Sequence, residues 1–211
     1  MDTTASLQRG CYHSAMKRLF LIGPVLFAIT ILALTYLQYD FERNLGWHPI
    51  FAVTLDWPSG LALGPYGEWM IATFILSGLL MFAFGLRLFS DLVPGAASRI
   101  GSALLASSGL CTAGLAFKTD PIFGTGPRTW HGYLHDFFFV LLGITLLLAM
   151  IFLSKAFRND PRWRNLGTYT WVTLAISIPA FFVKGFAFYI FLITFLTWNE
   201  IIALRYYLLQ R

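Results

Sequence analysis

Two histidines four positions apart have the spacing of a metal site. His131 and His135 lie in the stretch TDPIFGTGPRTWHGYLHD, residues 119–136, where a long apolar segment begins. On a helix, residues i and i+4 lie one turn apart on the same face. Two imidazoles placed in this way can ligate one zinc ion, which prefers four ligands and keeps a water as one of them in catalytic sites. Such a water becomes a nucleophile near neutral pH.

A carboxylate would complete this site. Asp120 begins the same loop and is the first candidate for the third metal ligand. Glu68, at the head of another apolar segment, and His48 are the next candidates. The sequence therefore predicts a zinc site formed by His131, His135 and Asp120. Glu68 and Asp120 are the candidate catalytic carboxylates, with Glu68 as a general base.

Three other interpretations of the histidine pair stay open. The pair can form a polar ligand site without metal, or it can cap the helix and bond to loop carbonyls. The HxxxH motif alone is weak and has many accidental matches. Haem is disfavoured, because two histidines on one helix face cannot bind opposite faces of a porphyrin. His48 would then have to supply the second haem ligand.

The composition is that of an integral membrane protein. The chain has 211 residues, of which 57% are hydrophobic and only 12% charged, and its mean hydropathy is +0.68. Soluble domains carry about 25% charged residues. An all-α bundle is expected, because helices satisfy their own backbone groups in lipid. The two cysteines, Cys11 and Cys111, are expected to lie too far apart for a disulfide.

Six apolar segments are long enough to cross the hydrocarbon core, which takes about 20 helical residues. The first is expected to be a retained span, since no small-residue cleavage site follows it. The last two are separated only by Lys184-Gly185, which we expect to form a tight turn. The chain is thus predicted to consist of a tail at 1–18 and one six-helix transmembrane domain at 19–211. The predicted spans are 19–38, 69–90, 100–117, 132–154, 165–183 and 186–207.

Lys and Arg are unevenly divided between the two sides of this bundle. Of the 15 basic residues, 11 fall on the side of the two termini and four on the other. Because cytoplasmic loops carry the basic excess, both termini are predicted to be cytoplasmic and the protein to be a multi-pass protein of the plasma membrane. Basic residues facing anionic lipid headgroups explain the net charge of +5 without a nucleic-acid partner.

Most groups able to do chemistry then gather on the outer side. They come from a long loop at 39–68, from the loop before His131 and from the start of the fourth span. The loop at 39–68 contains Trp47, Trp57 and many other apolar residues, so we expect it to fold over the bundle as a lid. Long loops in compact domains are usually functional or disordered.

Glu200 is an ionisable residue within the last predicted span. Counting from residue 207, it lies about 10 Å from the inner end at 1.5 Å per residue. Such residues usually face the bundle interior and often mark a function. One interpretation is a polar site on a proton or substrate path. The other is a buried carboxylic acid bonded to a hydroxyl such as that of Ser177 or Thr173.

Several short motifs resemble those of a known family. They are FKTDP at 117–121, HGYLH at 131–135, and Trp198 and Arg205 in the last span. With the long loop after the first span, they resemble the domain-of-unknown-function 998 family of six-span bacterial and archaeal membrane proteins. The resemblance covers most of residues 19–207.

This resemblance implies a six-span fold in a membrane. It also places the family's acidic residue and histidine pair at Asp120, His131 and His135. A looser likeness connects the chain to the alkaline ceramidase and progestin-receptor type of membrane hydrolase, which holds zinc with histidines and an aspartate. Six spans in place of seven, and the lack of a Ser-x-x-x-His motif in the sequence, argue against that second relationship.

Three functions are compatible with the residues. The leading hypothesis is metal-dependent hydrolysis of a lipid or other amphiphile at the outer face. The first rival is non-enzymatic binding or transport of a small amphiphile in the same place. The second is a structural subunit of a larger membrane complex. The residues do not decide between enzyme and binder, and they name no partner beyond the lipid bilayer.

Overall fold

Helices form the described part of the chain, as the all-α prediction requires. The computed structural model describes residues 3–46, 57–121, 126–182 and 186–209. Within these ranges it contains helices and no strand. His48 and the predicted turn at Lys184-Gly185 lie outside the described residues. The elements are α1 (Thr3–Leu37), α2 (Tyr39–Asn44), the 3-10 helix η1 (Pro58–Leu63), α3 (Gly67–Asp91), α4 (Ala96–Gly114), α5 (Trp130–Asn159), α6 (Arg164–Phe182) and α7 (Phe186–Leu209).

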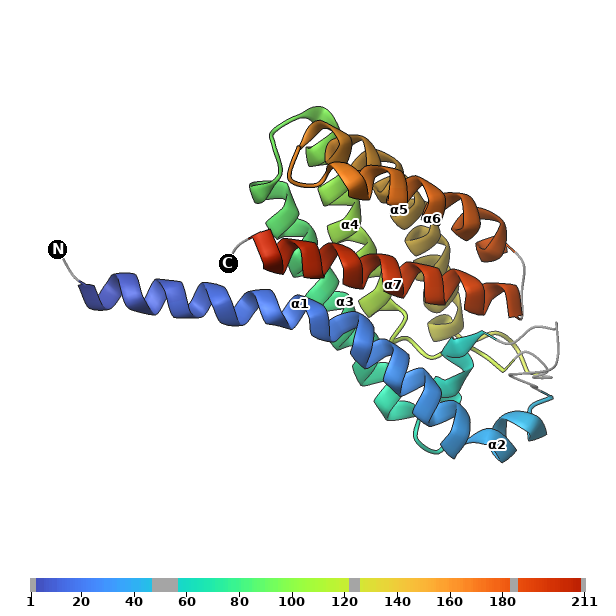
Figure 1. The fold of residues 1–211 in the computed structure, drawn as a ribbon. Coiled ribbons are helices and arrows are strands. Elements are labelled where there is room, and N and C mark those ends of the chain that lie inside the picture. Colours follow the sequence, from blue (N-terminus) through green and yellow to red (C-terminus); the bar gives the residue numbers. More distant parts are fainter. Residues whose placement is uncertain (1–2, 47–56, 122–125, 183–185, 210–211) are drawn as a thin grey trace.

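Six of these helices correspond to the six predicted apolar segments. α1 begins at Thr3, so it extends through most of the predicted N-terminal tail, and its N-terminal part projects beyond the bundle (Figure 1). α4 begins directly after Pro94-Gly95, earlier than the predicted 100–117, because this pair stops α3 and starts a new helix. By length and apolarity, four helices qualify as membrane spans, namely α1, α3, α5 and α7. The protein is therefore a membrane protein with four candidate spans.

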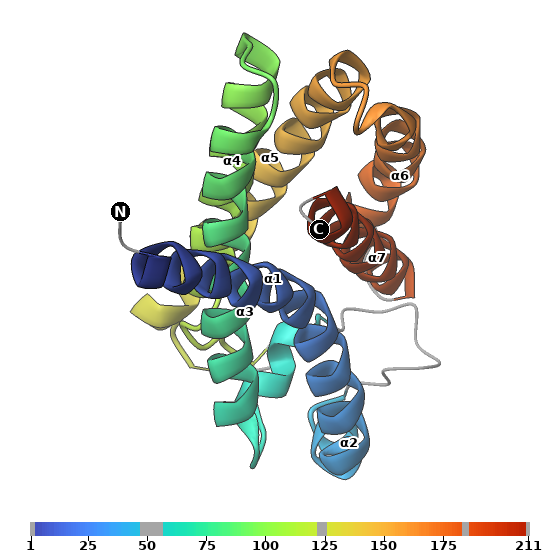
Figure 2. The same ribbon diagram turned by 60° about the vertical axis from the view of Figure 1, so that its left-hand side comes forward.

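The six long helices form a closed ring. Each packs on the next along the chain, from α1 and α3 through α4, α5 and α6 to α7, and α7 also packs against α1. Figure 2 shows α7 between α1 and α6, and α5 beside α4. A ring of this kind places side chains from every long helix around one interior.

Polar bonds fix one end of the ring. Arg162, between α5 and α6, donates from Nη2 to the backbone carbonyl of Asp91 at the end of α3 (2.9 Å). Arg205 of α7 donates to the carbonyl of Arg162, and Tyr206 donates to the Asp91 carboxylate (2.6 Å). The C-terminal end of α7 thus lies with the α3–α4 and α5–α6 connections (Figure 1).

Small residues let α3 and α4 approach closely. A Cβ built on Gly78 of α3 would lie 2.5 Å from the backbone nitrogen of Ala113, and one on Gly109 of α4 would collide with the backbone of Phe82. Such small-residue contacts are typical of helix pairs in membranes, where burial of apolar surface supplies little attraction between helices. The backbones of α3 and α4 are therefore in close contact at these glycines, and this contact holds α4 against α3.

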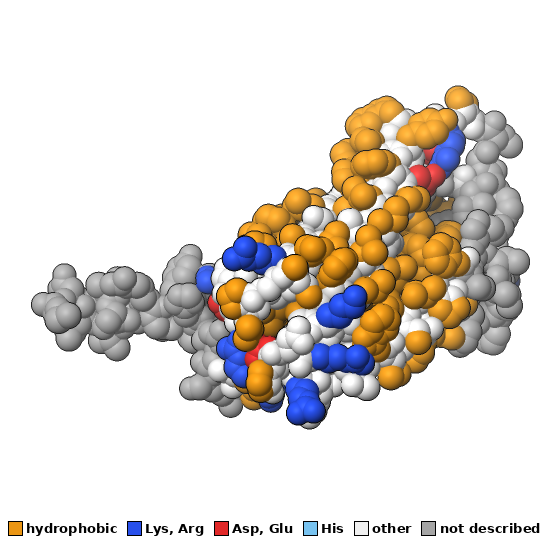
Figure 3. Space-filling model, turned by 90° about the horizontal axis from the view of Figure 1, so that it is seen from above, with side chains coloured by type: hydrophobic (Ala, Val, Ile, Leu, Met, Phe, Trp, Pro, Cys, Tyr) orange, Lys and Arg blue, Asp and Glu red, His pale blue; other side chains and the backbone are white. Residues whose placement is uncertain are grey.

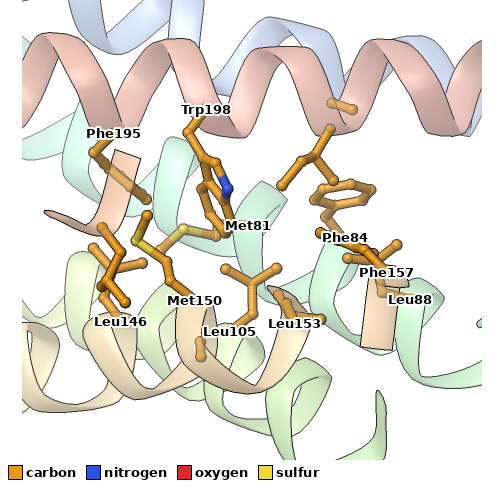
Figure 4. Packing of buried hydrophobic residues seen from close by; sticks show 14 of the residues in the cluster. Met81, Phe84, Leu88, Leu105, Leu146, Met150, Leu153, Phe157, Phe195 and Trp198 are labelled. Carbon is orange, nitrogen blue, oxygen red and sulfur yellow. The ribbon is translucent and has the colours of Figure 1, made fainter. Parts of the chain in front are cut away.

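Large side chains fill the interior of the ring around Trp198. Trp198 is fully buried and projects from α7 toward Met81 and Met150 (Figure 4). Its indole Nε1 donates to Thr170 Oγ1 of α6 at 2.9 Å, so the one polar atom of the ring is satisfied. This packing ties α3, α5, α6 and α7 together.

The outer surface is mainly apolar. Many large hydrophobic side chains on the long helices are exposed, among them Ile29, Leu32 and Ile193. Figure 3 shows apolar side chains over much of the described surface in view, with most Lys and Arg gathered toward one end and a basic side chain beside acidic ones at the other. Contiguous apolar surface of this extent marks contact with lipid or with other proteins.

Candidate functional site

The loop before α5 is anchored by Asp120. Its Oδ2 accepts the backbone N–H of Thr129 (3.0 Å) and its Oδ1 accepts the Thr129 hydroxyl (2.6 Å). Thr129 is in turn the N-cap of α5 and accepts the N–H of Gly132 (3.2 Å). A Cβ at Gly132 would collide with the Asp120 carboxylate, so glycine is needed there for the close approach. Asp120 thus supports the start of the helix that carries both histidines.

The same contacts set the charge state of Asp120. The Thr129 hydroxyl contributes most to holding the pKa of the Asp120 carboxyl below its ordinary value, with smaller contributions from the Thr129 N–H, Arg128 and His131. Arg128 Nε lies 3.8 Å from Asp120 Oδ2 and its guanidinium also pairs with Asp136. The ionised form of Asp120 is the one that caps the loop.

His131 lies beside this cap. Its Nδ1 is 3.2 Å from Thr129 Oγ1, and its ring centroid is 4.1 Å from that of Trp130. The side chain is partly exposed at the surface. Its described contacts are therefore with the first turn of its own helix.

His135, one turn further along α5, is turned into the bundle. It is only 4% exposed. Its Nδ1 lies 2.7 Å from the carbonyl oxygen of Phe117 and 3.1 Å from that of Leu115, both just after α4. Because a carbonyl can only accept, Nδ1 must carry the proton, and a neutral imidazole then has its lone pair on Nε2. This nitrogen is left for a ligand.

The two histidines thus share a helix face but not an environment. Among the described residues, no group of three or more His, Cys, Asp or Glu side chains is close enough together to hold a metal ion. Asp120 directs both carboxylate oxygens at Thr129. Metal binding by His131, His135 and Asp120 stays a prediction.

The other two predicted carboxylates are placed differently. Glu68, at the start of α3, forms an exposed ion pair with Lys118 (3.1 Å) and so links α3 to the α4–α5 loop. Glu200 of α7 has its Oε2 buried, and no described residue donates a hydrogen bond to this atom. The structure brings neither of them to the histidines through a described contact.

A cavity lies inside the ring of helices. Its volume, on the scale used for cavities in other proteins, is about 80 Å³; all space free of protein atoms, the open space at its mouth included, is about 890 Å³. Ligand pockets commonly have apolar walls with a few polar groups. The polar side chains lining this cavity are Ser59, Ser77, Thr112, His135 and Asn199.

Aromatic side chains make most of the cavity wall. They come from α1, α3, α5, α6 and α7. Nine of them are phenylalanines, namely Phe20, Phe27, Phe74, Phe84, Phe139, Phe181, Phe188, Phe191 and Phe195. Trp57, from the predicted loop at 39–68, closes on them, with ring centroids 4.7 Å from Phe139 and 4.4 Å from Phe188. The loop thus contributes a wall of the cavity.

The polar groups of the wall differ in how they are satisfied. The Ser77 hydroxyl donates to the carbonyl of Gly23 (3.0 Å), and that of Thr112 to the carbonyl of Ser108 (2.9 Å). Asn199 is only 6% exposed, and its side chain hydrogen-bonds to no described residue. Ser59, His135 and Asn199 are therefore the polar wall side chains with hydrogen-bonding capacity that no described residue uses.

Local sequence patterns did not reveal this cavity. Asn199 precedes Glu200 in the last predicted span, and the phenylalanines are spread over five helices. A polar amide in an otherwise apolar span was the available signal, since polar residues in spans usually face the interior.

Comparison with known proteins identifies a family. No curated protein and no solved structure matches the chain. The sequence model of the family described as "Protein of unknown function (DUF998)" matches residues 21–205, which span the C-terminal half of α1, all of α3 to α6 and most of α7. The chain therefore belongs to the DUF998 family of proteins of unknown function.

Proposed function

We propose that this protein binds a small amphiphile in the central cavity, with the ligand's polar group at His135 and its apolar body among the aromatic side chains. The observation that carries the proposal is the fixed imidazole of His135, buried in the cavity wall with Nδ1 held by two backbone carbonyls. An imidazole held in this way presents Nε2 in one orientation, which is what a specific polar contact requires.

The wall supports an apolar body for the ligand. Burial of apolar surface contributes roughly 25 cal/mol per Å², and aromatic walls provide much of it without polar groups to desolvate. Since the space around α1, α5 and α7 is largely phenylalanine, a strongly polar solute would lose its water there without replacement. A lipid-soluble ligand fits this wall better than a sugar or an ion does.

We also propose that all six long helices cross the plasma membrane. α4 leads from the α3–α4 connection near Asp91 to Lys118, which pairs with Glu68 at the opposite end of α3. α4 therefore runs the length of α3. Its lower apolarity comes from Ser and Thr hydroxyls, and those of Ser107 and Ser108 bond to carbonyls one turn earlier, which reduces their cost in lipid.

Two matched variants test the proposal. The full chain is purified in mild detergent, its organic extract is analysed by mass spectrometry, and the same is done for His135→Leu and His131→Leu. We expect His135→Leu to lose about 90% of a copurifying amphiphile, as a lost hydrogen bond costs about a factor of ten in affinity. His131→Leu should retain it, because His131 does not line the cavity.

Other results would contradict the proposal. Equal retention in His135→Leu would remove the role of the imidazole. Loss in both variants, together with loss of about one bound metal ion per chain, would favour the metal-dependent hypothesis instead. Thermal unfolding without ligand is the control for folding, because His135→Leu leaves the carbonyls of Leu115 and Phe117 without their donor.

A further inference from the structure

Asn199 places a second polar group at the other end of the cavity. α5 and α7 both start at the end of the ring that holds the α4–α5 loop. His135 is the first residue of α5 that lines the cavity, whereas Asn199 is the last residue of α7 that does so. Phe139, one turn after His135 on α5, contacts Phe188 of α7 (ring centroids 5.9 Å apart), so His135 lies about one turn before the level of Phe188. Phe188 and Asn199 are 11 positions apart on α7, so the levels of His135 and Asn199 differ by about 22 Å at 1.5 Å per residue.

The surroundings of Asn199 leave its amide without a hydrogen-bond partner from the described part of the protein. The residue is only 6% exposed, its side chain lines the cavity, and no described residue bonds to it. A ligand that displaces water from this amide must offer it a hydrogen bond, because a polar group taken out of water without a partner is unfavourable. Its neighbours in the wall, Phe195 and Leu196, offer no hydrogen bonds. A donor or acceptor from within the cavity is the partner that this position lacks.

We infer that the ligand is a long, narrow molecule with a hydrogen-bonding group at each end, one for His135 and one for Asn199. The inference rests on the proposed function and names the class of ligand: a chain-like lipid-soluble molecule with a terminal hydroxyl, carbonyl or carboxyl group at both ends. Hydrogen bonds of about 2.8 Å at the two ends leave about 16 Å of the distance between the two groups for the ligand itself. At about 1.3 Å of advance per bond, from bond lengths near 1.5 Å, a chain of about 12 carbons with an oxygen at each end matches that length.

The walls between the two polar groups fit such a chain. Phe139 and Leu142 of α5 face the same space as Leu192 and Phe195 of α7. No hydrogen-bonding side chain of α5 or α7 lines the cavity between His135 and Asn199. An unbranched hydrocarbon segment needs no hydrogen-bond partner there, whereas a hydroxyl in the middle of the chain would be left unpaired.

Simple alcohols test this inference on the full chain in detergent. Dodecanol carries one hydroxyl and dodecanediol one at each end, and binding is measured as the concentration-dependent rise in unfolding temperature. We expect the diol to bind about tenfold more tightly than dodecanol to the wild type, as one additional buried hydrogen bond provides. In Asn199→Leu the two should bind equally. Octanediol, too short to reach both groups, should gain nothing over octanol.

The outcomes separate this inference from the proposed function. Binding of dodecanol without any advantage of the diol would overturn the second polar contact and leave the cavity function standing. Binding of neither alcohol would overturn both. Retained dodecanol binding by Asn199→Leu shows that the variant is folded and its cavity intact. A diol advantage that persists in Asn199→Leu would show that Asn199 is not the group contacted.

Discussion

The imidazoles of His131 and His135 are one helical turn apart, yet their ring nitrogens meet different partners. His131 contacts the capping residue Thr129 at the surface, whereas His135 bonds to the carbonyls of Leu115 and Phe117 inside the bundle. The spacing predicted a shared helix face, and α5 provides it. The spacing could not predict the carbonyls, because they belong to the end of another helix 18 and 20 positions earlier in the chain.

Asp120 should make stability depend on acidity. Because hydrogen bonds from Thr129 lower the pKa of Asp120 in the folded protein, the carboxylate stabilises the fold above its unfolded pKa of about 3.9, and this stability is lost as pH falls through the lower, folded pKa. We expect the unfolding temperature of the wild type to fall between about pH 5 and about pH 2. In Asp120→Asn this part of the dependence should vanish.

A second variant identifies the source of the effect. Thr129→Val removes the hydroxyl that contributes most to the lowered pKa of Asp120, so it should flatten the same pH profile as Asp120→Asn does. It should also cost about 1 kcal/mol at neutral pH, because α5 loses its N-cap. Unchanged profiles in both variants would show that the Asp120–Thr129 contact does not stabilise the protein.

At the scale of helices, apolar length predicted most of the fold. The segments predicted at 69–90 and 186–207 became α3 and α7 with ends moved by a few residues. The prediction was poorer for α4, because Leu115, Ala116 and Phe117 continue the apolar pattern after the helix has ended at Gly114. The pattern also did not reveal that backbone proximity at glycines, more than apolarity, holds α4 to α3.

Close packing of α3 and α4 predicts a steep cost for added side-chain volume. Gly109→Leu should lower the free energy of unfolding by about 3 kcal/mol or more, because a side chain there collides with the backbone of Phe82. Gly95→Leu is the matched control: its nearest neighbour, Ser98 Oγ, is 3.9 Å from a built Cβ, and its extended backbone admits any residue. Equilibrium unfolding in mixed detergent micelles measures both. Similar losses in the two variants would contradict the packing.

At the scale of the whole molecule, the cavity exists only because the ring closes. Its wall takes residues from all six long helices and from the loop before η1, and no single segment of the sequence contains it. Composition was sufficient to predict a membrane-embedded helical bundle, while the positions of Trp57, His135 and Asn199 around one space depend on tertiary packing. This is why the sequence pointed to the outer face and the geometry points to the interior.

The proposed six-span topology predicts which connections are accessible from each side. With Cys11 and Cys111 replaced by serine and alanine, Gly95→Cys in the α3–α4 turn and Gly126→Cys in the α4–α5 loop each provide one thiol. A membrane-impermeant maleimide applied outside sealed cells should label Gly126→Cys directly and Gly95→Cys only after permeabilisation, because α4 separates the two positions. Labelling of both from the same side would show that α4 does not cross.

The most direct test of the central claim is an experimental density map of the protein purified in mild detergent with its natural ligand retained. The account predicts continuous, elongated density inside the ring, with one end in hydrogen-bonding distance of the His135 imidazole and its length along Phe139 and Phe188. A cavity filled by rearranged phenylalanine side chains, or one containing only separate water-sized peaks, would contradict it.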